Sequence, residues 1–198
     1  DGKPTQPIKV GDSVLSLVDG TVRPNNVKNH TATHMLQAAL QTILGPHVKQ
    51  AGSVVHDKYL RFDFSHHQAM ASDEIAKTEN LVNEKIWEDI HTNITYATLK
   101  QAKDMGVISF FGEKYNPEEV RIVEIPGFSS ELCGGTHASS TGIIGAFKII
   151  SETALSTGVR RIVAITGPEA INIFRQSFTS IKKLSEKFKV KPEEVVSA

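Results

Sequence analysis

The stretch NHTATHMLQAALQTIL (residues 29–44) contains the pattern that decides the fold of this chain. Its apolar residues recur at the three- and four-residue spacing of an amphipathic helix: Met35, Leu36, Ala39, Leu40 and Ile43. Residues four apart lie on one face of a helix, so His30 and His34 point to the same side. The pattern predicts a helix that ends at Gly45 and Pro46 and presents two imidazoles together.

A second motif, CGGTH (residues 133–137), contains the only cysteine of the chain. Cys133 and His137 flank two glycines, which allow a loop to turn tightly enough to aim both side chains at one point. Thiolate and imidazole are ligands that zinc prefers. Together with His30 and His34, this motif completes a set of four such ligands, and we interpret them as one shared metal site.

Each motif on its own has a simpler interpretation. A histidine pair at this spacing is often an ordinary core or surface pair, and a single cysteine is most often a small buried hydrophobe. The prediction of a metal site therefore depends on the two motifs together. The remaining histidines show no such arrangement, and we expect most of them to be solvated: His47, His56, His66, His67 and His91.

The composition excludes several classes of protein. The chain has 198 residues, of which 39% are hydrophobic, enough for one large or two small domains with a core. Its 22 basic and 22 acidic residues exclude a generally basic nucleic-acid binder. No apolar run approaches the roughly 20 residues of a membrane span, and residues 1–7 lack the apolar core of a signal peptide. One cysteine cannot form an internal disulfide, so we expect a cytoplasmic protein without a membrane partner.

Basic residues are nevertheless concentrated in some segments. They outnumber acidic residues from Lys148 to the end of the chain. Arg160 and Arg161 begin an apolar strand beside a glycine-containing turn, and Arg61 has a similar strand context. We predict that these three arginines contact phosphates. The lysines of the segment 182–191 are further candidates, but they fit a solvated helix face equally well.

The remaining pattern predicts an α+β fold. Runs rich in β-branched residues, bounded by glycine and proline, predict strands at 14–18, 53–55, 59–64, 93–99, 120–125, 143–150 and 159–166. The runs 53–55 and 59–64 form a hairpin. A helix at 73–90, capped by Ser72, carries an apolar stripe, and a closing helix starts at Pro168. Beyond Ile181 the closing helix is amphipathic and lysine-rich, as expected of a connector that packs on another element.

Five runs, in order along the chain, carry a family resemblance: NHTATHML (29–36), LRFDFSH (60–66), FGEKY (111–115), ELCGGTH (131–137) and GVRR (158–161). Together they resemble the editing region of alanyl-tRNA synthetase, and the resemblance covers most of the chain. This ordered set is far more specific than an isolated His-x-x-x-His, which threonyl-tRNA synthetase editing domains share. In that family the region hydrolyses alanine tRNA wrongly charged with serine or glycine.

The resemblance implies an α+β architecture in three parts. These are a remnant of a small β-barrel at 1–25, a zinc-containing editing core at 26–167, and a closing helix with the start of a connector at 168–198. The core would have an antiparallel-rich sheet with packed helices, the second additional domain type of threonyl- and alanyl-tRNA synthetases. The resemblance also implies one Zn2+ per chain and a cytoplasmic location. The implied partner is the acceptor end of tRNA(Ala) carrying serine or glycine, with no protein partner evident.

The resemblance also implies a set of metal ligands: His30, His34, Cys133 and His137. Thr33, Gln50 and Ser53 would line the pocket, and Cys133 would serve in catalysis with them. A pocket that recognises one extra hydroxyl needs a fixed polar partner, because an apolar wall discriminates poorly. Without the resemblance, Thr33 is equally well explained by a hydrogen bond to its own helix, and Gln50 by a strand position that faces solvent.

The implied reaction is hydrolysis of the ester between an amino acid and the terminal adenosine of tRNA. The sequence shows no Ser-His-Asp arrangement, so water is the expected nucleophile. Zinc could lower the pKa of that water or polarise the carbonyl if one coordination position is open. Four protein ligands would instead close the site and make the metal a scaffold. The sequence leaves both roles open.

Other functions fit parts of the sequence. The chain is too short for the ATP- and Mg2+-dependent aminoacylation domain, so we expect an editing fragment, with a freestanding trans-editing deacylase as the alternative. A zinc protease is disfavoured, because Thr31 occupies the position of the glutamate in His-Glu-x-x-His. A non-catalytic, zinc-stabilised tRNA-binding module remains open. Chelation would unfold such a module, and bound tRNA would stay charged.

Overall fold

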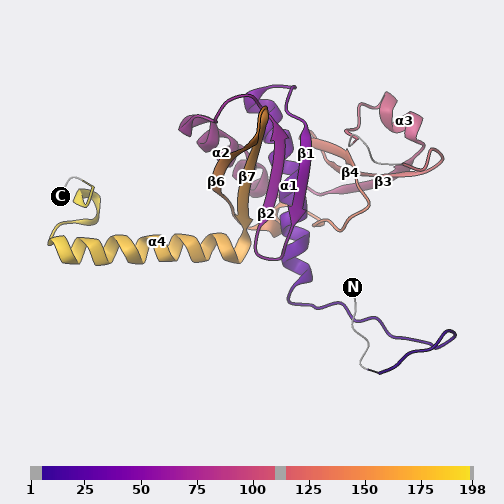
Figure 1. The fold of residues 1–198 in the computed structure, drawn as a ribbon, viewed down its shortest axis with the longest axis horizontal. Helices are drawn as coiled ribbons and strands as arrows, with labels where there is room; N and C mark the ends of the chain where they lie inside the picture. Colours follow the sequence, from indigo (N-terminus) through magenta and orange to yellow (C-terminus); the bar gives the residue numbers. More distant parts are fainter. Residues whose placement is uncertain (1–5, 110–114, 197–198) are drawn as a thin grey trace.

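A computed structural model describes residues 6–109 and 115–196 of the chain. These residues form an α+β fold, as predicted, with four α-helices and two antiparallel sheets. Figure 1 shows helix α1 (Arg23–Leu44) and the first sheet at the centre, the second sheet to one side, and helix α4 (Gly167–Phe188) extending away from the body. Most of the FGEKY run, at 111–114, lies outside the described residues.

Helix α1 is the central element of the fold. Three of its apolar side chains have no exposed surface: Met35, Leu36 and Leu40. The helix ends where the sequence predicts, because Gly45 adopts a φ of 115°, which favours glycine, and Pro46 follows it. Its start is earlier than predicted, at Arg23 instead of Asn29, with a proline in the first turn.

The first sheet has four antiparallel strands in the order β1-β2-β7-β6. Their bounds are Gln50–Val55 for β1, Leu60–Ser65 for β2, Phe147–Ser156 for β6 and Val159–Thr166 for β7. The hairpin β1-β2 and strand β7 confirm the prediction. The strand predicted at 143–150 is only partly right, because Thr141–Ile144 forms a 3-10 helix, η1, and β6 begins after it.

The hydrophobic core lies between this sheet and helices α1 and α2 (Ser72–Trp87). Alternate side chains of β2 have no exposed surface: Leu60, Phe62 and Phe64. At the start of α2, Ala71 holds the cap position, and its backbone amide donates to the carboxylate of Glu74 at 2.7 Å. The prediction that Ser72 caps this helix is therefore wrong by one residue, and the helix ends at Trp87, short of the predicted residue 90.

A second, smaller sheet packs beside α1 in the order β3-β4-β5. Its strands are Asn93–Ala97, Val120–Ile125 and Ser129–Leu132. The sequence predicts β4 at its observed bounds. It makes β3 too long, because Thr98 caps a short helix, α3 (Leu99–Asp104), that was not predicted. Strand β5 was not predicted either, although the CGGTH loop follows it directly.

The strand predicted at residues 14–18 is wrong. Residues 12–19 form neither helix nor strand, and four apolar side chains in them are exposed: Val14, Leu15, Leu17 and Val18. An apolar run of this kind is stable as a strand only when other strands pair with it, and no described residue does so. Residues 6–22 thus contribute no strand to the predicted barrel remnant, and residues 1–5 are not described. The boundaries of the parts 1–25, 26–167 and 168–198 remain predictions.

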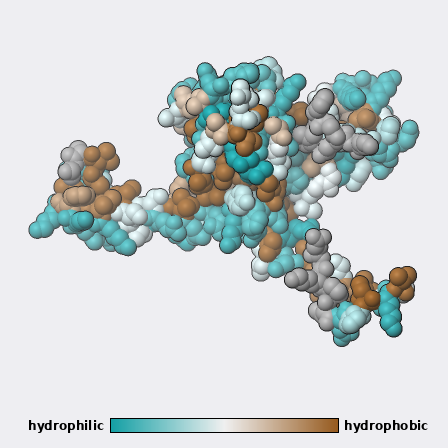
Figure 2. All heavy atoms as spheres, in the orientation of Figure 1, coloured by the Kyte–Doolittle hydropathy of each residue, from teal (hydrophilic) through white to brown (hydrophobic). Residues whose placement is uncertain are grey.

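Helix α4 begins at Gly167 with Pro168, as the sequence predicts, and continues to Phe188. Beyond its first turn it extends away from the body (Figure 1). Its apolar side chains there are exposed: Ile171, Phe174, Phe178, Ile181, Leu184 and Phe188. Figure 2 shows apolar residues gathered at the far end of the helix. None of the helices formed by the described residues has the length and hydropathy needed to cross a membrane.

Two phenylalanines provide a matched test of this core. Replacing Phe62, which is fully buried, with alanine should lower the free energy of unfolding by about 3–5 kcal/mol, because it removes buried apolar surface and leaves a cavity. Phe178→Ala, at a residue that is 71% exposed, should change it by less than about 0.5 kcal/mol. Urea unfolding measures both values, and equal effects would contradict the position of the core.

Candidate metal centre

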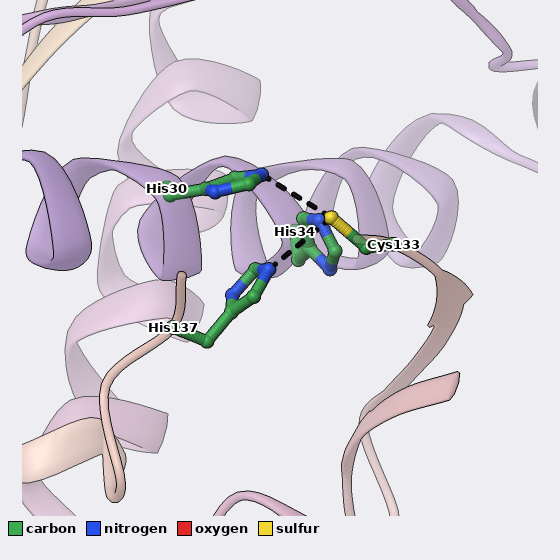
Figure 3. A group of neighbouring side chains, drawn as sticks. All are labelled: His30, His34, Cys133 and His137. Atoms are coloured by element: carbon green, nitrogen blue, oxygen red, sulfur yellow. Dashed lines mark hydrogen bonds between the residues drawn. The ribbon is translucent and has the colours of Figure 1, made fainter. Parts of the chain in front are cut away.

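The four predicted metal ligands come together in the structure. Helix α1 contributes His30 and His34, and the loop after β5 contributes Cys133 and His137 (Figure 3). One ligand atom from each side chain lies within 4.8 Å of all the others. The prediction that the two motifs converge is confirmed, although 103 positions separate His30 from Cys133 in the sequence.

The spacing of these atoms fits a tetrahedral metal ion. The sulfur of Cys133 lies 3.4 Å from Nε2 of His30 and 3.3 Å from Nε2 of His137. Bonds of about 2.3 Å from zinc to sulfur and about 2.0 Å to nitrogen, at a tetrahedral angle, place the two ligand atoms about 3.5 Å apart. These two distances match a shared metal ion, and the full set of ligand atoms, all within 4.8 Å of one another, would draw closer around it.

The loop that carries Cys133 and His137 is shaped by Arg121 of β4. Nη1 of Arg121 donates to the carbonyl oxygens of Cys133 and Gly135, both at 2.8 Å. Gly135 has no room for a side chain, because a Cβ atom there would lie 2.1 Å from Cε1 of His30. The loop approaches α1 closely enough to share a metal ion because this residue is glycine.

Two of the imidazoles have a polar partner at Nδ1. Nδ1 of His137 lies 3.2 Å from the hydroxyl of Thr31, which also accepts from the backbone amide of Ala138 at 2.9 Å. Nδ1 of His34 lies 3.4 Å from Oε2 of Glu131. A partner at Nδ1 fixes the orientation of each ring, and a carboxylate there favours the proton on Nδ1 of His34, which leaves the lone pair of Nε2 free for a metal. Neither Thr31 nor Glu131 was predicted to support the site.

Burial keeps the three imidazoles neutral. It is the largest cause of the lowered pKa values of His30, His34 and His137, and the last of these falls to about 3. Repulsion between the histidines lowers the pKa values of His34 and His137 further, whereas a hydrogen bond with the backbone of Thr136 partly opposes the shift at His30. Neutral imidazole is the form that binds a metal, so the thiol of Cys133 is the ligand that must lose a proton.

Glu131 is a buried carboxylate beside this neutral cluster. Its side chain is 1% exposed, and its Oε1 accepts from the hydroxyl of Ser129 at 3.0 Å. Burial raises the pKa of Glu131 to about 7, and the hydrogen bond from Ser129 acts in the opposite direction. Because burial lowers the pKa of His34, its imidazole is neutral, and the 3.4 Å approach to Glu131 is not an ion pair.

A cavity of about 170 Å³ opens beside the cluster. Gln50 and Ser53 of β1 line it together with three of the ligand residues, and Nε2 of Gln50 donates to Oγ of Ser53 at 3.2 Å. Residues three apart on a regular strand face opposite sides. A β-bulge between Gln50 and Gly52 changes the register, so that both predicted pocket residues reach the same cavity.

The third predicted pocket residue, Thr33, has a different environment. It is 3% exposed, and its hydroxyl donates to the backbone carbonyl of Asn29 at 2.8 Å. It is not among the residues that line the cavity. In the structure Thr33 bonds to its own helix, as in the simpler interpretation, and contact with a substrate, which would require another rotamer, remains a prediction.

The arginines predicted to contact phosphates are all held by carboxylates. Arg161 forms two hydrogen bonds with Asp63, at 2.7 and 2.9 Å, and Arg61 approaches the same carboxylate at 3.4 Å. Arg160 binds Glu152 through two nitrogens. The side chains of Asp63 and Glu152 are each 5% exposed. A phosphate at these arginines would compete with buried partners, and their tRNA contact remains a prediction.

One histidine expected to be solvated is buried. His66 is 7% exposed, and its Nδ1 lies 2.9 Å from Nε2 of His47. The turn-like sequence around His66 did not indicate this partner, which lies 19 positions earlier.

Comparison with known proteins places this site within a known family of sequences. A family model described as threonyl and alanyl tRNA synthetase second additional domain matches residues 120–163, which include β4, β5 and the CGGTH loop. The chain is 48% identical over 182 residues to an alanine–tRNA ligase of Carboxydothermus hydrogenoformans, covering 92% of this chain and 21% of the relative. It is 47% identical over 184 residues to that of Halalkalibacterium halodurans, covering 93% and 21%. It is 46% identical over 190 residues to that of a Thermoanaerobacter species, covering 96% and 22%. The chain thus spans about a fifth of the length of the curated relatives it matches.

Glu131 should contribute to metal affinity through His34. Glu131→Gln keeps the shape of the side chain but removes the negative charge that Glu131 carries beside Nδ1 above its pKa of about 7, so at about pH 8 we expect about a 10- to 100-fold weaker affinity for zinc. Ser129→Ala keeps the carboxylate and should have a smaller effect. Competition with a chromogenic chelator measures both affinities. Equal affinity of the Glu131→Gln variant and the unmodified protein would contradict this role.

The stability of the metal-free protein should depend on pH in two opposing ways. The three imidazoles have lowered pKa values and bind fewer protons in the folded than in the unfolded chain, so the free energy of unfolding falls as the pH drops from about 7 to about 5. Glu131, with its raised pKa, binds a proton in the folded protein over this range and opposes the loss. Glu131→Gln should therefore steepen the loss, as urea unfolding with a chelator present would measure. A shallower loss of stability in this variant would show that Glu131 does not oppose the effect of the histidines.

Proposed function

Because the chain belongs to the alanyl-tRNA synthetase family, in the part that carries the second additional domain, we propose that it hydrolyses the ester that joins serine or glycine to tRNA(Ala). The observation that supports this most directly is the cavity beside the four ligands, with Gln50 and Ser53 on its wall. Its volume of about 170 Å³ is smaller than the roughly 300–1,000 Å³ of sites for drug-sized ligands, and it suits a small aminoacyl group.

The metal proposed for this site is one Zn2+ per chain. A thiolate and three imidazoles are the donor set that zinc prefers among common divalent ions. When bound, zinc would supply positive charge beside the ester carbonyl. The ligand residues themselves connect α1 to the loop after β5 and so fix one wall of the cavity.

Selection for serine is proposed to depend on Gln50 and Ser53. In the structure, the amide of Gln50 donates to the hydroxyl of Ser53. The hydroxyl of a seryl group in the cavity could accept from the amide of Gln50 or bond to Ser53, whereas alanine offers no such group. A site built to hydrogen-bond a hydroxyl disfavours the analogue that lacks it. Glycine would be admitted by its small size.

The attack on the ester is proposed to come from water. The hydroxyl of Ser53 bonds to Gln50 and not to a histidine, so nothing on the cavity wall activates it as a nucleophile. The sulfur of Cys133 is enclosed by Nε2 of His30, Nε2 of His137 and the amide of Gly135, which suits a ligand better than a nucleophile. The predicted catalytic role of Cys133 would then be to hold the metal.

The relatives carry the name of an enzyme that joins alanine to tRNA. We propose that ATP and Mg2+ serve that reaction in parts of the relatives outside the matched fifth. This chain would act on the same tRNA in the cytoplasm and remove amino acids that the synthesis step attached wrongly.

A deacylation assay tests the proposal. The metal-loaded protein should release serine from seryl-tRNA(Ala) faster than alanine from alanyl-tRNA(Ala). Cys133→Ala should lose both the metal and the activity. Gln50→Ala should lower kcat/KM for seryl-tRNA(Ala) about tenfold, since the buried hydroxyl of the substrate loses a partner. Gln176→Ala, on the exposed surface of α4, is the matched control and should match the unmodified protein.

One outcome of this assay would contradict the proposal. If metal-loaded protein binds seryl-tRNA(Ala) and leaves it charged, the chain is a tRNA-binding module and not a deacylase.

A further inference from the structure

We propose that a second cavity, where the start of α4 meets α1 and η1, binds phosphates of an RNA backbone through Lys28 and Arg175. The proposal rests on the proposed function for the identity of the RNA, because tRNA is the substrate of the editing reaction. This cavity is separate from the metal centre, and its cations, Lys28 and Arg175, are not the arginines of β2 and β7.

The cavity has a volume of about 430 Å³ and is lined by three segments of the chain. Lys28 comes from α1, Ile143 and Ile144 from η1, and Arg175 from α4. Nζ of Lys28 lies 3.4 Å from the position that a Cβ atom on Gly167 would take, so the ammonium group lies over the first residue of α4. The volume is within the roughly 300–1,000 Å³ of small-ligand sites, enough for a phosphate with its sugar.

Neither cation is held by a carboxylate. Within 6–109 and 115–196, no ion pair or side-chain hydrogen bond involves the ammonium of Lys28 or the guanidinium of Arg175. The arginines of β2 and β7, in contrast, are bound to buried carboxylates. A phosphate at those arginines has to displace a charged partner. At Lys28 and Arg175 it has to displace only water and counterions.

The remaining walls favour an anion. No carboxylate lines the cavity, and its one uncharged polar side chain, Asn172, has an amide that can donate a hydrogen bond. Ile143 and Ile171 contribute apolar surface. Apolar surroundings lower the local dielectric and strengthen the attraction between a phosphate and the two positive charges.

The position of Lys28 relates this cavity to the metal centre. It precedes the ligand His30 by two residues on α1, which is a rise of about 3 Å and a rotation of about 200° along a helix. The two side chains therefore leave the helix on nearly opposite sides. A single RNA that reaches both places would therefore have to pass around the first turns of α1.

Binding of uncharged tRNA(Ala), measured over a series of salt concentrations, tests the proposal. Lys28→Ala with Arg175→Ala should weaken binding, and the slope of log affinity against log salt should become shallower by about two, about one for each lost phosphate contact. Lys100→Ala with Lys103→Ala removes the same charge from the exposed surface of α3, which does not line the cavity, and this control should have a smaller effect. Lys28→Arg keeps the charge and should bind nearly as well as the unmodified protein.

The outcomes separate this proposal from the proposed function, because uncharged tRNA involves no hydrolysis. Unchanged affinity and slope in the Lys28→Ala, Arg175→Ala variant would overturn the phosphate site even if deacylation is observed. Equal losses in this variant and in the Lys100, Lys103 control would overturn it too, since general electrostatic attraction would explain both. Metal content and thermal unfolding midpoint, which should match the unmodified protein, show that a loss of binding does not come from unfolding.

Discussion

The structure depends on the close approach of helix α1 to the loop after β5. Three neutral imidazoles and a thiol meet there. Each of these buried polar groups needs a hydrogen-bond partner or a metal ion to compensate for the loss of contact with water. Arg121 holds the loop in place through two carbonyl oxygens, and glycine at 135 lets the loop lie against His30. The two sheets are brought together at this contact, because α1 packs on the first and the loop extends from the second. The contact between α1 and the loop after β5 therefore both joins the two sheets and assembles the metal ligands.

The elements that the sequence predicted correctly are those with a strong local pattern. Helix α1 has a complete apolar stripe and a glycine at its end, and strands β4 and β7 are long runs of β-branched residues with buried faces. Strand β5 was missed because Ser129 and Glu131 are polar side chains that are nevertheless buried: they bond to each other, and Glu131 lies beside His34. At residues 14–18 the sequence instead predicted a strand that is not formed. The residue types there favour a strand, but no strand of the described chain pairs with them.

In the candidate site, too, some residues could be predicted from local sequence patterns and others could not. Its four ligands could be predicted because helix spacing and a glycine-containing loop are visible in the sequence. The side chains around them could not be predicted in the same way. Thr31 differs from Thr33 by two positions and supports a ligand, whereas Thr33 bonds to its own helix. The pairing of Gln50 with Ser53 at one cavity depends on a bulge, and a bulge changes register without a signal in the alternation of apolar residues.

The two adjacent glycines of the CGGTH loop have unequal freedom to vary. Neither has a positive φ, so the backbone alone does not require glycine at either position. A Cβ atom on Gly134 would meet nothing within 4 Å, whereas one on Gly135 would overlap the ring of His30. A single added methyl group at the second position would thus separate helix from loop while every ligand is still present. The ring of His30 therefore requires glycine at 135 as strictly as the cluster requires its ligands, whereas a side chain at 134 would extend into the open space of the neighbouring cavity.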